Sequence, residues 1–280
     1  MTENIFGQQQ FYEKYLSFNE ALLKAQVKNM KRLMASVSFE KLSKIDVQAR
    51  IKSGRHIIDP RDIVIEENDL EELYDRILPI VKKYYGENEE LKRFDDLNDK
   101  RKFSLKVLVE NLLLRNEDNW QSLSEKLNLS KNTLLKMAEY ISAPYFEMCA
   151  EYFNQKFRLE NWKQSFCPIC GNEPSMAMVN EKKGYRVLWC CLCETEWRFK
   201  ENVCPFCWCN DLKKIKHIFP QNSSSHRIDA CDNCKKYLKT IDGQMITKVP
   251  NFVVEHFATY RLDILAHEKG YKMHITPYLI

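Results

Sequence analysis

Apolar and polar positions in the first 160 residues follow a helical period. In residues 11–36 the apolar side chains recur every three or four positions between lysines, which predicts an amphipathic helix. Gly54 and Pro60 make residues 40–68 look irregular, and Pro79 is expected to kink or end the helix that contains it. Similar spacing predicts helices over residues 70–81, 103–116, 119–127, 131–142 and 145–160. The N-terminal part is therefore predicted to be helical.

The pattern changes after residue 166. Apolar residues alternate with polar ones on both sides of residues 180–184, which predicts a β-hairpin. Short alternating runs continue to residue 219, and Asp242-Gly243 gives a turn signal between two more such runs. From Val253 to Ala266 the apolar positions again trace one helical stripe. A region of short strands and a C-terminal helix are therefore expected.

Composition narrows the class of protein. The chain has 280 residues, which suggests about two domains, and 44% hydrophobic with 29% charged residues is typical of a folded globular protein. The net charge of +4 is too small to indicate a nucleic-acid binder by itself. No uncharged apolar run approaches the ~18 residues of a membrane span, and MTENIFGQQQ lacks the pattern of a secretory signal. A cytoplasmic location without membrane partners is the expectation.

Cysteine carries the candidate chemistry. Ten of the 11 cysteines follow residue 166, and eight of them form four C-x-x-C pairs. A two-residue gap lets a tight turn place both sulfurs on one side, so that two pairs can surround one metal ion. The pairs are Cys167/Cys170, Cys190/Cys193, Cys204/Cys207 and Cys231/Cys234. The spacing favours sequential sites, with the first and second pair on one ion and the third and fourth on another, although a cross-braced arrangement stays open.

Two ions, zinc or iron, are the expected cofactors of these eight cysteines. Redox pairs and disulfides are disfavoured, because four pairs within 68 residues of a chain without a secretory signal are typical of metal binding. Gly171 follows the first pair, whereas Glu194, Trp208 and Lys235 follow the others, a departure from rubredoxin-type sequences that favours structural zinc. Cys149 is expected in the core. Cys191 and Cys209 neighbour the ligands, and their roles stay open.

The cysteine segments resemble a known family. CPICG, SMAMV, LWCCLCETEW, CPFC and CDNCKKYLK occur in this order, and together they resemble the formate dehydrogenase accessory proteins, the FdhE-like family. The resemblance is strongest over residues 166–240 and continues weakly to the final ITPYL. HIIDPRDIVIEENDLEELYDRIL, at residues 56–78, is only a loose match.

The resemblance implies an α+β fold: an all-α N-terminal domain, two small rubredoxin- or zinc-ribbon-like β modules and a C-terminal helix. The corresponding boundaries are 1–162 for the helical domain, 163–202 and 203–249 for the two four-cysteine modules, and 250–280 for the helix and tail. It also implies an accessory factor or chaperone, not an enzyme. Such a factor binds the catalytic subunit of a molybdenum or tungsten formate dehydrogenase during maturation, beside a sulfurtransferase.

Other functions stay open at this stage. Residues 120–141 loosely resemble a helix-turn-helix, with residues 130–136 opening the recognition helix, but arginines are few and a plain helical hairpin explains the pattern better. An iron site would instead permit a rubredoxin-like redox role. The sequence contains no G-x-S-x-G or H-E-x-x-H, and His56 is not expected to be catalytic. Trp197 and Trp208 are candidate exposed anchors for a partner; the alternative is that they pack against the metal loops.

Overall fold

The computed structural model describes residues 2–37, 39–114, 116–180, 185–220, 225–246 and 249–273. The chain forms two compact units, one from the described residues of 1–45 and 58–148, the other from those of 46–57 and 149–277. The first is helical, whereas the second contains a six-stranded sheet, two groups of four cysteines and the C-terminal helices. The predicted α+β fold class is confirmed.

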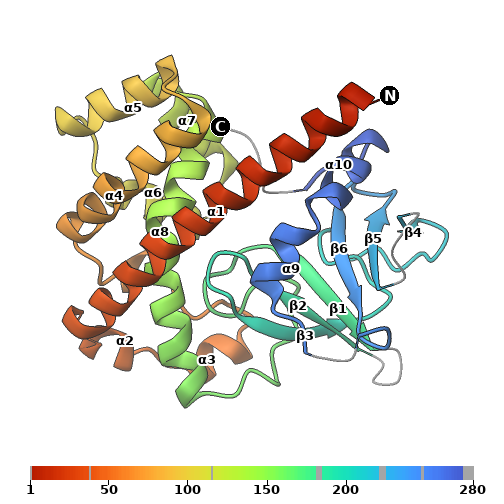
Figure 1. The fold of residues 1–280 in the computed structure, drawn as a ribbon. Helices are drawn as coiled ribbons and strands as arrows, with labels where there is room; N and C mark the ends of the chain where they lie inside the picture. The colour runs from red at the N-terminus through yellow and green to blue at the C-terminus, as the bar shows by residue number, and fades with distance from the viewer. Residues whose placement is uncertain are drawn as a thin grey trace. The chain divides into compact units, whose positions relative to one another are not determined.

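The helical elements follow the predicted pattern, with differences in detail (Figure 1). Residues 40–68, expected to be irregular, contain three short helical pieces. The expected helices at 131–142 and 145–160 are one continuous helix. The bounds are α1 Thr2–Ser36, α2 Glu40–Ser43, α3 Val47–Lys52, η1 Pro60–Asp62, α4 Glu67–Tyr85, α5 Glu89–Asp99, α6 Leu105–Leu114, α7 Glu117–Leu127 and α8 Lys131–Lys156.

Two prolines lie inside helices. Pro79 was expected to kink or end its helix. Helix α4 continues past Pro79, so the expectation that the helix ends there was wrong. Proline has no backbone N–H, so Pro79 cannot donate to the carbonyl of Asp75, four residues earlier. Both residues are exposed, and water can therefore donate to that carbonyl instead. The opposite face of α4 stays buried along its whole length, through Leu70, Leu73, Tyr74, Ile77, Leu78 and Val81.

Pro144 in α8 is compensated by a distant side chain. A proline at this position cannot donate to the carbonyl of Tyr140. The Nε2 amide of Gln26, on α1, donates to that carbonyl at 2.9 Å, and the side chain of Gln26 is buried. The proline therefore does not leave this carbonyl unsatisfied, and α8 remains one helix.

A single mixed sheet forms the centre of the second unit. Its strand order is β3-β2-β1-β6-β5-β4, and every neighbouring pair is antiparallel except β1 with β6. Each half of the sheet is a three-stranded meander, and the parallel β1–β6 pair joins the two halves. The strands are β1 Met176–Asn180, β2 Tyr185–Trp189, β3 Glu196–Lys200, β4 Ile215–Ile218, β5 His226–Cys231 and β6 Tyr237–Asp242.

Two helices cover one face of the sheet, α9 Phe252–Ala258 and α10 Tyr260–Glu268 (Figure 1). The single helical stripe expected here is thus divided at Thr259. Phe252 of α9 stacks on Trp189 with ring centroids 5.8 Å apart, and α10 packs on residues of β5 and β6. Beneath α10 the ammonium of Lys239 is fully buried, 2.8 Å from a carboxylate oxygen of Asp263.

Candidate metal centres

Four six-residue loops with the same backbone hydrogen bonds present the cysteine pairs. We call them knuckle 1 (167–172), knuckle 2 (190–195), knuckle 3 (204–209) and knuckle 4 (231–236). In each, the N–H of the first residue donates to the carbonyl of the sixth at 2.7–3.1 Å, and the N–H of the fifth donates to the carbonyl of the first at 2.8–3.0 Å. Each knuckle is therefore closed by contacts within its own six residues.

The fifth residue of every knuckle has a positive φ. The angle is 77° at Gly171, 57° at Glu194, 58° at Trp208 and 57° at Lys235. Glycine enters this left-handed region freely, whereas a residue with a Cβ atom is strained there. Because the backbone is the same with and without glycine, the three missing glycines do not distinguish a zinc site from an iron site. The inference drawn from them in favour of zinc is therefore withdrawn.

The knuckles bring the eight cysteines together in two groups. The first cluster consists of Cys167, Cys170, Cys190 and Cys193, and the second of Cys204, Cys207, Cys231 and Cys234. Within each group the four sulfurs lie within 4.8 Å of one another. The grouping follows the sequential order, in which each cluster takes two consecutive pairs.

Both clusters have the dimensions of a tetrahedral tetrathiolate site. A metal–sulfur bond of about 2.3 Å places the sulfurs of such a site about 3.8 Å apart. The measured distances are 3.4 Å for Cys167–Cys193, 3.6 Å for Cys170–Cys190, and 3.7 Å for both Cys204–Cys234 and Cys207–Cys231. These values are far too long for disulfides, whose sulfurs are about 2.05 Å apart. The donor set therefore fits a divalent ion.

The protonation energetics of the thiols favour the same interpretation. Burial raises the pKa of the Cys170 and Cys204 thiols well above the ordinary value, although the N–H groups of Phe206 and Cys207 donate to the Cys204 sulfur and oppose the shift. At Cys207 burial also opposes ionisation, but donation from Asn233 and from the Cys209 N–H contributes to lowering the pKa to about 7. Four such thiols ionise together only beside a cation.

Parts of the chain are similar in sequence to known proteins. The family model for the FdhE central domain matches residues 166–200. An FdhE homologue of Aquifex aeolicus is 29% identical over 120 residues, 41% of this chain and 42% of that protein. FdhE of Escherichia coli O1:K1 is 31% identical over 140 residues, 48% of this chain and 44% of that protein. The chain is similar to these FdhE proteins.

A solved structure extends the similarity to the whole fold. The crystal structure of FdhE from Pseudomonas aeruginosa superimposes with a TM-score of 0.55, covering 96% of this chain and 94% of that one, at 16% sequence identity. Both units of this FdhE-like chain thus have counterparts in that fold. The sequence matches to the curated relatives span less than half of their length, 42–44%.

The two clusters of the FdhE-like chain differ in solvent access. All four cysteines of the first cluster are buried, with at most 2% of their surface exposed, whereas Cys207 and Cys234 of the second are partly exposed. Knuckle 1 is covered by residues 56 and 57. The N–H of Ile57 donates to the Pro168 carbonyl at 2.7 Å, and a Cβ atom at Gly171 would lie 2.7 Å from the His56 ring. The His56 ring therefore packs against the backbone of knuckle 1.

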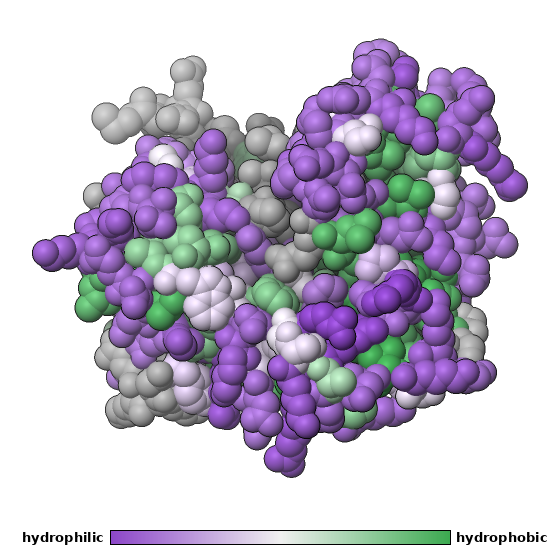
Figure 2. Space-filling view, turned by 180° about the vertical axis from the view of Figure 1, so that it is seen from behind, coloured by the Kyte–Doolittle hydropathy of each residue, from purple (hydrophilic) through white to green (hydrophobic). Residues whose placement is uncertain are grey.

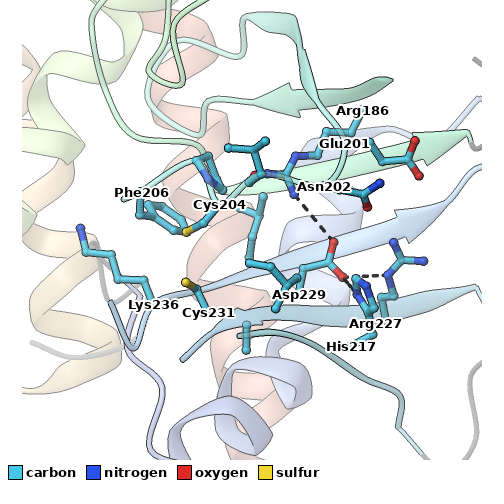
Figure 3. Close-up of a pocket in the computed structure, with 15 residues that line it drawn as sticks. Arg186, Glu201, Asn202, Cys204, Phe206, His217, Arg227, Asp229, Cys231 and Lys236 are labelled. Atoms are coloured by element: carbon cyan, nitrogen blue, oxygen red, sulfur yellow. Dashed lines mark hydrogen bonds and ion pairs between the residues drawn. The ribbon is translucent and has the colours of Figure 1, made fainter. Parts of the chain in front are cut away.

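A charged network around the buried carboxylate of Asp229 lies beside the second cluster, and no sequence pattern indicated it (Figure 3). The carboxylate of Asp229 on β5 accepts from Arg227 at 2.7 Å, contacts the His217 ring nitrogen at 2.7 Å and lies 3.9 Å from the Arg186 guanidinium. Burial opposes ionisation of Asp229, but these partners lower its pKa to about 2. Arg186, on β2, also donates to the carbonyl of Val203, one residue before knuckle 3.

The three cysteines outside the pairs and the two candidate anchor tryptophans differ in burial. Cys149 is fully buried, as expected, and Cys191 packs against the core around Trp189. Neither Cys191 nor Cys209 belongs to a cluster. Trp197 is only 3% exposed, so its proposed role as an exposed anchor was wrong: alternate residues of β3 point inward. Trp208 is 45% exposed, with its ring edge-on to Phe199.

The segment resembling a helix-turn-helix does not present a recognition surface. Helix α8 is mostly buried in its first half, including Thr133, Leu134 and Lys136, where a DNA-reading helix would expose its side chains. This burial favours the helical-hairpin interpretation. Separately, no helix among the described residues combines the length and the apolar character needed to cross a membrane.

Proposed function

We propose that this chain is a cytoplasmic accessory factor that binds the catalytic subunit of a molybdenum or tungsten formate dehydrogenase during maturation, with a sulfurtransferase as a second maturation partner. The observation that carries the proposal is the coincidence of two four-cysteine clusters on one sheet with the FdhE match over residues 166–200. The function of the chain then lies in binding, and no catalytic step is assigned to it.

The eight cysteines are the proposed ligands of two ions. A zinc ion bound there would supply a structural cross-link, and an iron ion would add one-electron redox chemistry. The protein contributes the four closed knuckles, which hold the sulfurs in position before the ion arrives. The absorption spectrum of anaerobically purified protein, recorded after a mild oxidant is added, distinguishes the two metals, because oxidation gives a coloured ferric tetrathiolate whereas a zinc tetrathiolate stays colourless.

Trp208 is the proposed anchor for the client. It exposes a large aromatic ring on a strained backbone, and rings of this kind contribute much of the binding energy in protein interfaces. Hydrophilic residues cover most of the face seen in Figure 2, and the apolar residues on it occur in separate groups. An anchor at a defined position is therefore a more specific hypothesis than a broad apolar face.

Direct binding to the purified catalytic subunit tests the proposal. The immobilised full chain should capture the cofactor-free catalytic subunit of formate dehydrogenase from the same host more strongly than the mature enzyme. Trp208→Gly removes the ring and relieves the backbone strain, so it should lose capture without losing stability. Trp120→Phe, in the buried part of α7, is the matched control and should retain capture. Failure of the wild-type chain to bind either form would contradict the proposal.

A gel-shift experiment with duplex DNA tests the competing hypothesis of a nucleic-acid-binding regulator. Binding by phosphate contacts weakens steeply as the salt concentration rises. The accessory-factor proposal expects no salt-dependent shift.

A further inference from the structure

We propose that the second cluster is an exchangeable metal site that opens at knuckle 3, while the first cluster keeps its ion. This inference rests on the proposed metal binding and adds a division of labour between the two sites. The species that leaves the site is a divalent cation, and a soluble chelator or a competing thiolate accepts it.

The sulfurs of the two clusters differ in how easily a chelator reaches them. A chelator removes an ion by replacing one sulfur at a time, so the rate depends on how easily it reaches the first sulfur. In the first cluster no cysteine exposes more than 2% of its surface. In the second, Cys207 and Cys234 are both partly exposed, and Asn233, whose amide lies 3.5 Å from the Cys207 sulfur, is exposed as well. An incoming ligand therefore meets the second cluster first.

The knuckles also differ in how neighbouring segments hold them. Backbone hydrogen bonds from other segments hold knuckle 1 through Ile57 and knuckle 4 through Lys272, whose N–H donates to the Lys235 carbonyl at 2.8 Å. Knuckle 2 is supported by the Ser175 hydroxyl, which accepts from the Cys191 N–H at 3.3 Å. Within the described residues, no hydrogen bond between backbone groups joins knuckle 2 or knuckle 3 to another segment, but knuckle 2 belongs to the buried first cluster, whereas knuckle 3 belongs to the partly exposed second one.

A small cavity lies beneath knuckle 3. Cys204, Pro205 and Phe206 line part of it, and its volume is about 20 Å³ (Figure 3). Arg186 crosses this cavity from β2 and donates to the Val203 carbonyl, while its own Nε has no hydrogen-bond partner among the described residues. Knuckle 3 is thus attached through side chains: Arg186 at the Val203 carbonyl, the Trp208 ring against Phe199, and the Asn233 amide at the Cys207 sulfur. These contacts can change without breaking a hydrogen bond between backbone groups, so knuckle 3 is the segment of the second cluster that can move.

Exchange of the metal ion requires no electron transfer. The incoming donor forms a bond to the ion as the bond to the Cys207 sulfur breaks, and the released thiolate takes a proton from solvent. Repetition at the other three sulfurs transfers the ion, still divalent, to the chelator.

The test uses the full-length chain loaded with zinc, with the two-ion content established first. Excess 4-(2-pyridylazo)resorcinol removes the zinc while N-ethylmaleimide labels the freed thiols, and peptide mass spectrometry locates the labels. One ion per chain should leave at least about ten times faster than the other, with Cys207 and Cys234 labelled in the fast phase. A single rate for both ions, or earlier labelling of the first cluster, would overturn the inference.

Arg186→Met tests the attachment of knuckle 3. Loss of the guanidinium should speed release of the second ion by about ten-fold or more and leave release of the first unchanged, since residues that support metal ligands have effects of this size. Arg198→Met is the matched control, because Arg198 is exposed on the neighbouring strand β3 and should change neither rate. If Arg186→Met does not fold, the wild-type rates still decide the question.

The failure of this inference and that of the proposed function are distinguishable. A chain that holds two ions with equal release rates and captures formate dehydrogenase loses only the exchange hypothesis. A chain with unequal rates that captures no formate dehydrogenase loses only the accessory function. Fewer than two ions before the chelator is added would contradict the metal binding on which the inference depends.

Discussion

The fifth residue of the knuckles provides a matched test of the site's backbone geometry. Glu194 has a φ of 57° and is exposed. A residue with a Cβ atom in the left-handed region lowers the free energy of unfolding by about 1–2 kcal/mol. Glycine avoids this strain but loses about 0.5–1 kcal/mol through its greater freedom in the unfolded chain. Glu194→Gly is therefore predicted to raise the free energy of unfolding by about 0.5–1 kcal/mol.

Two further variants separate this strain from other effects. Glu194→Ala removes the carboxylate but keeps a Cβ atom in the left-handed region, so it should give no such gain. Gly171→Ala should act in the opposite direction, because its Cβ would be strained and would lie 2.7 Å from the His56 ring. The expected loss of stability is about 1–3 kcal/mol.

Urea unfolding followed by tryptophan fluorescence measures these differences. Four of the five tryptophans, at positions 162, 189, 197 and 208, belong to the unit that contains the knuckles. The free zinc concentration must be fixed, because unfolding releases the metal and the two equilibria are linked. Two results together would contradict the shared left-handed geometry of the knuckles: equal free energies of unfolding for Glu194→Gly and Glu194→Ala, and no loss of stability in Gly171→Ala.

Two predictions concern buried polar groups. Gln26→Leu should lower the free energy of unfolding of the helical unit by about 1–3 kcal/mol, because the Tyr140 carbonyl loses its donor. In a Pro144→Ala background the backbone N–H can replace that donor, so far-ultraviolet circular dichroism during urea unfolding should show a smaller penalty; an equal penalty contradicts the argument. Lys239→Met should cost about 3–5 kcal/mol by leaving the buried Asp263 carboxylate without its cation, although the Tyr237 hydroxyl still donates to it, and Asp263→Leu in the same chain should recover most of this loss. A neutral Lys239→Met would show that the pair contributes nothing.

The sequence predicted the local features of this molecule well. Each knuckle is closed by hydrogen bonds within six residues, so the C-x-x-C spacing alone indicated it. The helices of the first unit followed from the apolar period. Sequential grouping of the cysteine pairs followed from the hairpin between Cys170 and Cys190, which returns the chain to the first knuckle.

Features that depend on distant contacts could not be predicted in this way. Pro144 signals a break, and only Gln26, 118 positions earlier in the sequence, explains why α8 continues. The parallel pairing of β1 with β6 joins segments that are about sixty residues apart and has no local signal. The contact between Arg186 and Asp229 crosses from one half of the sheet to the other. Trp197 was misplaced because alternation along β3 indicates two faces but not which of them is buried.

Metal content is the most direct measurement of the central claim that eight cysteines hold two ions. Elemental analysis of anaerobically purified full-length chain should give two ions for the wild type and for Cys149→Ser, whose buried thiol lies outside both clusters. Cys170→Ser and Cys231→Ser should each lose the ion of their own cluster and retain one. A metal-free wild-type chain, or variants that still hold two ions, would contradict the account.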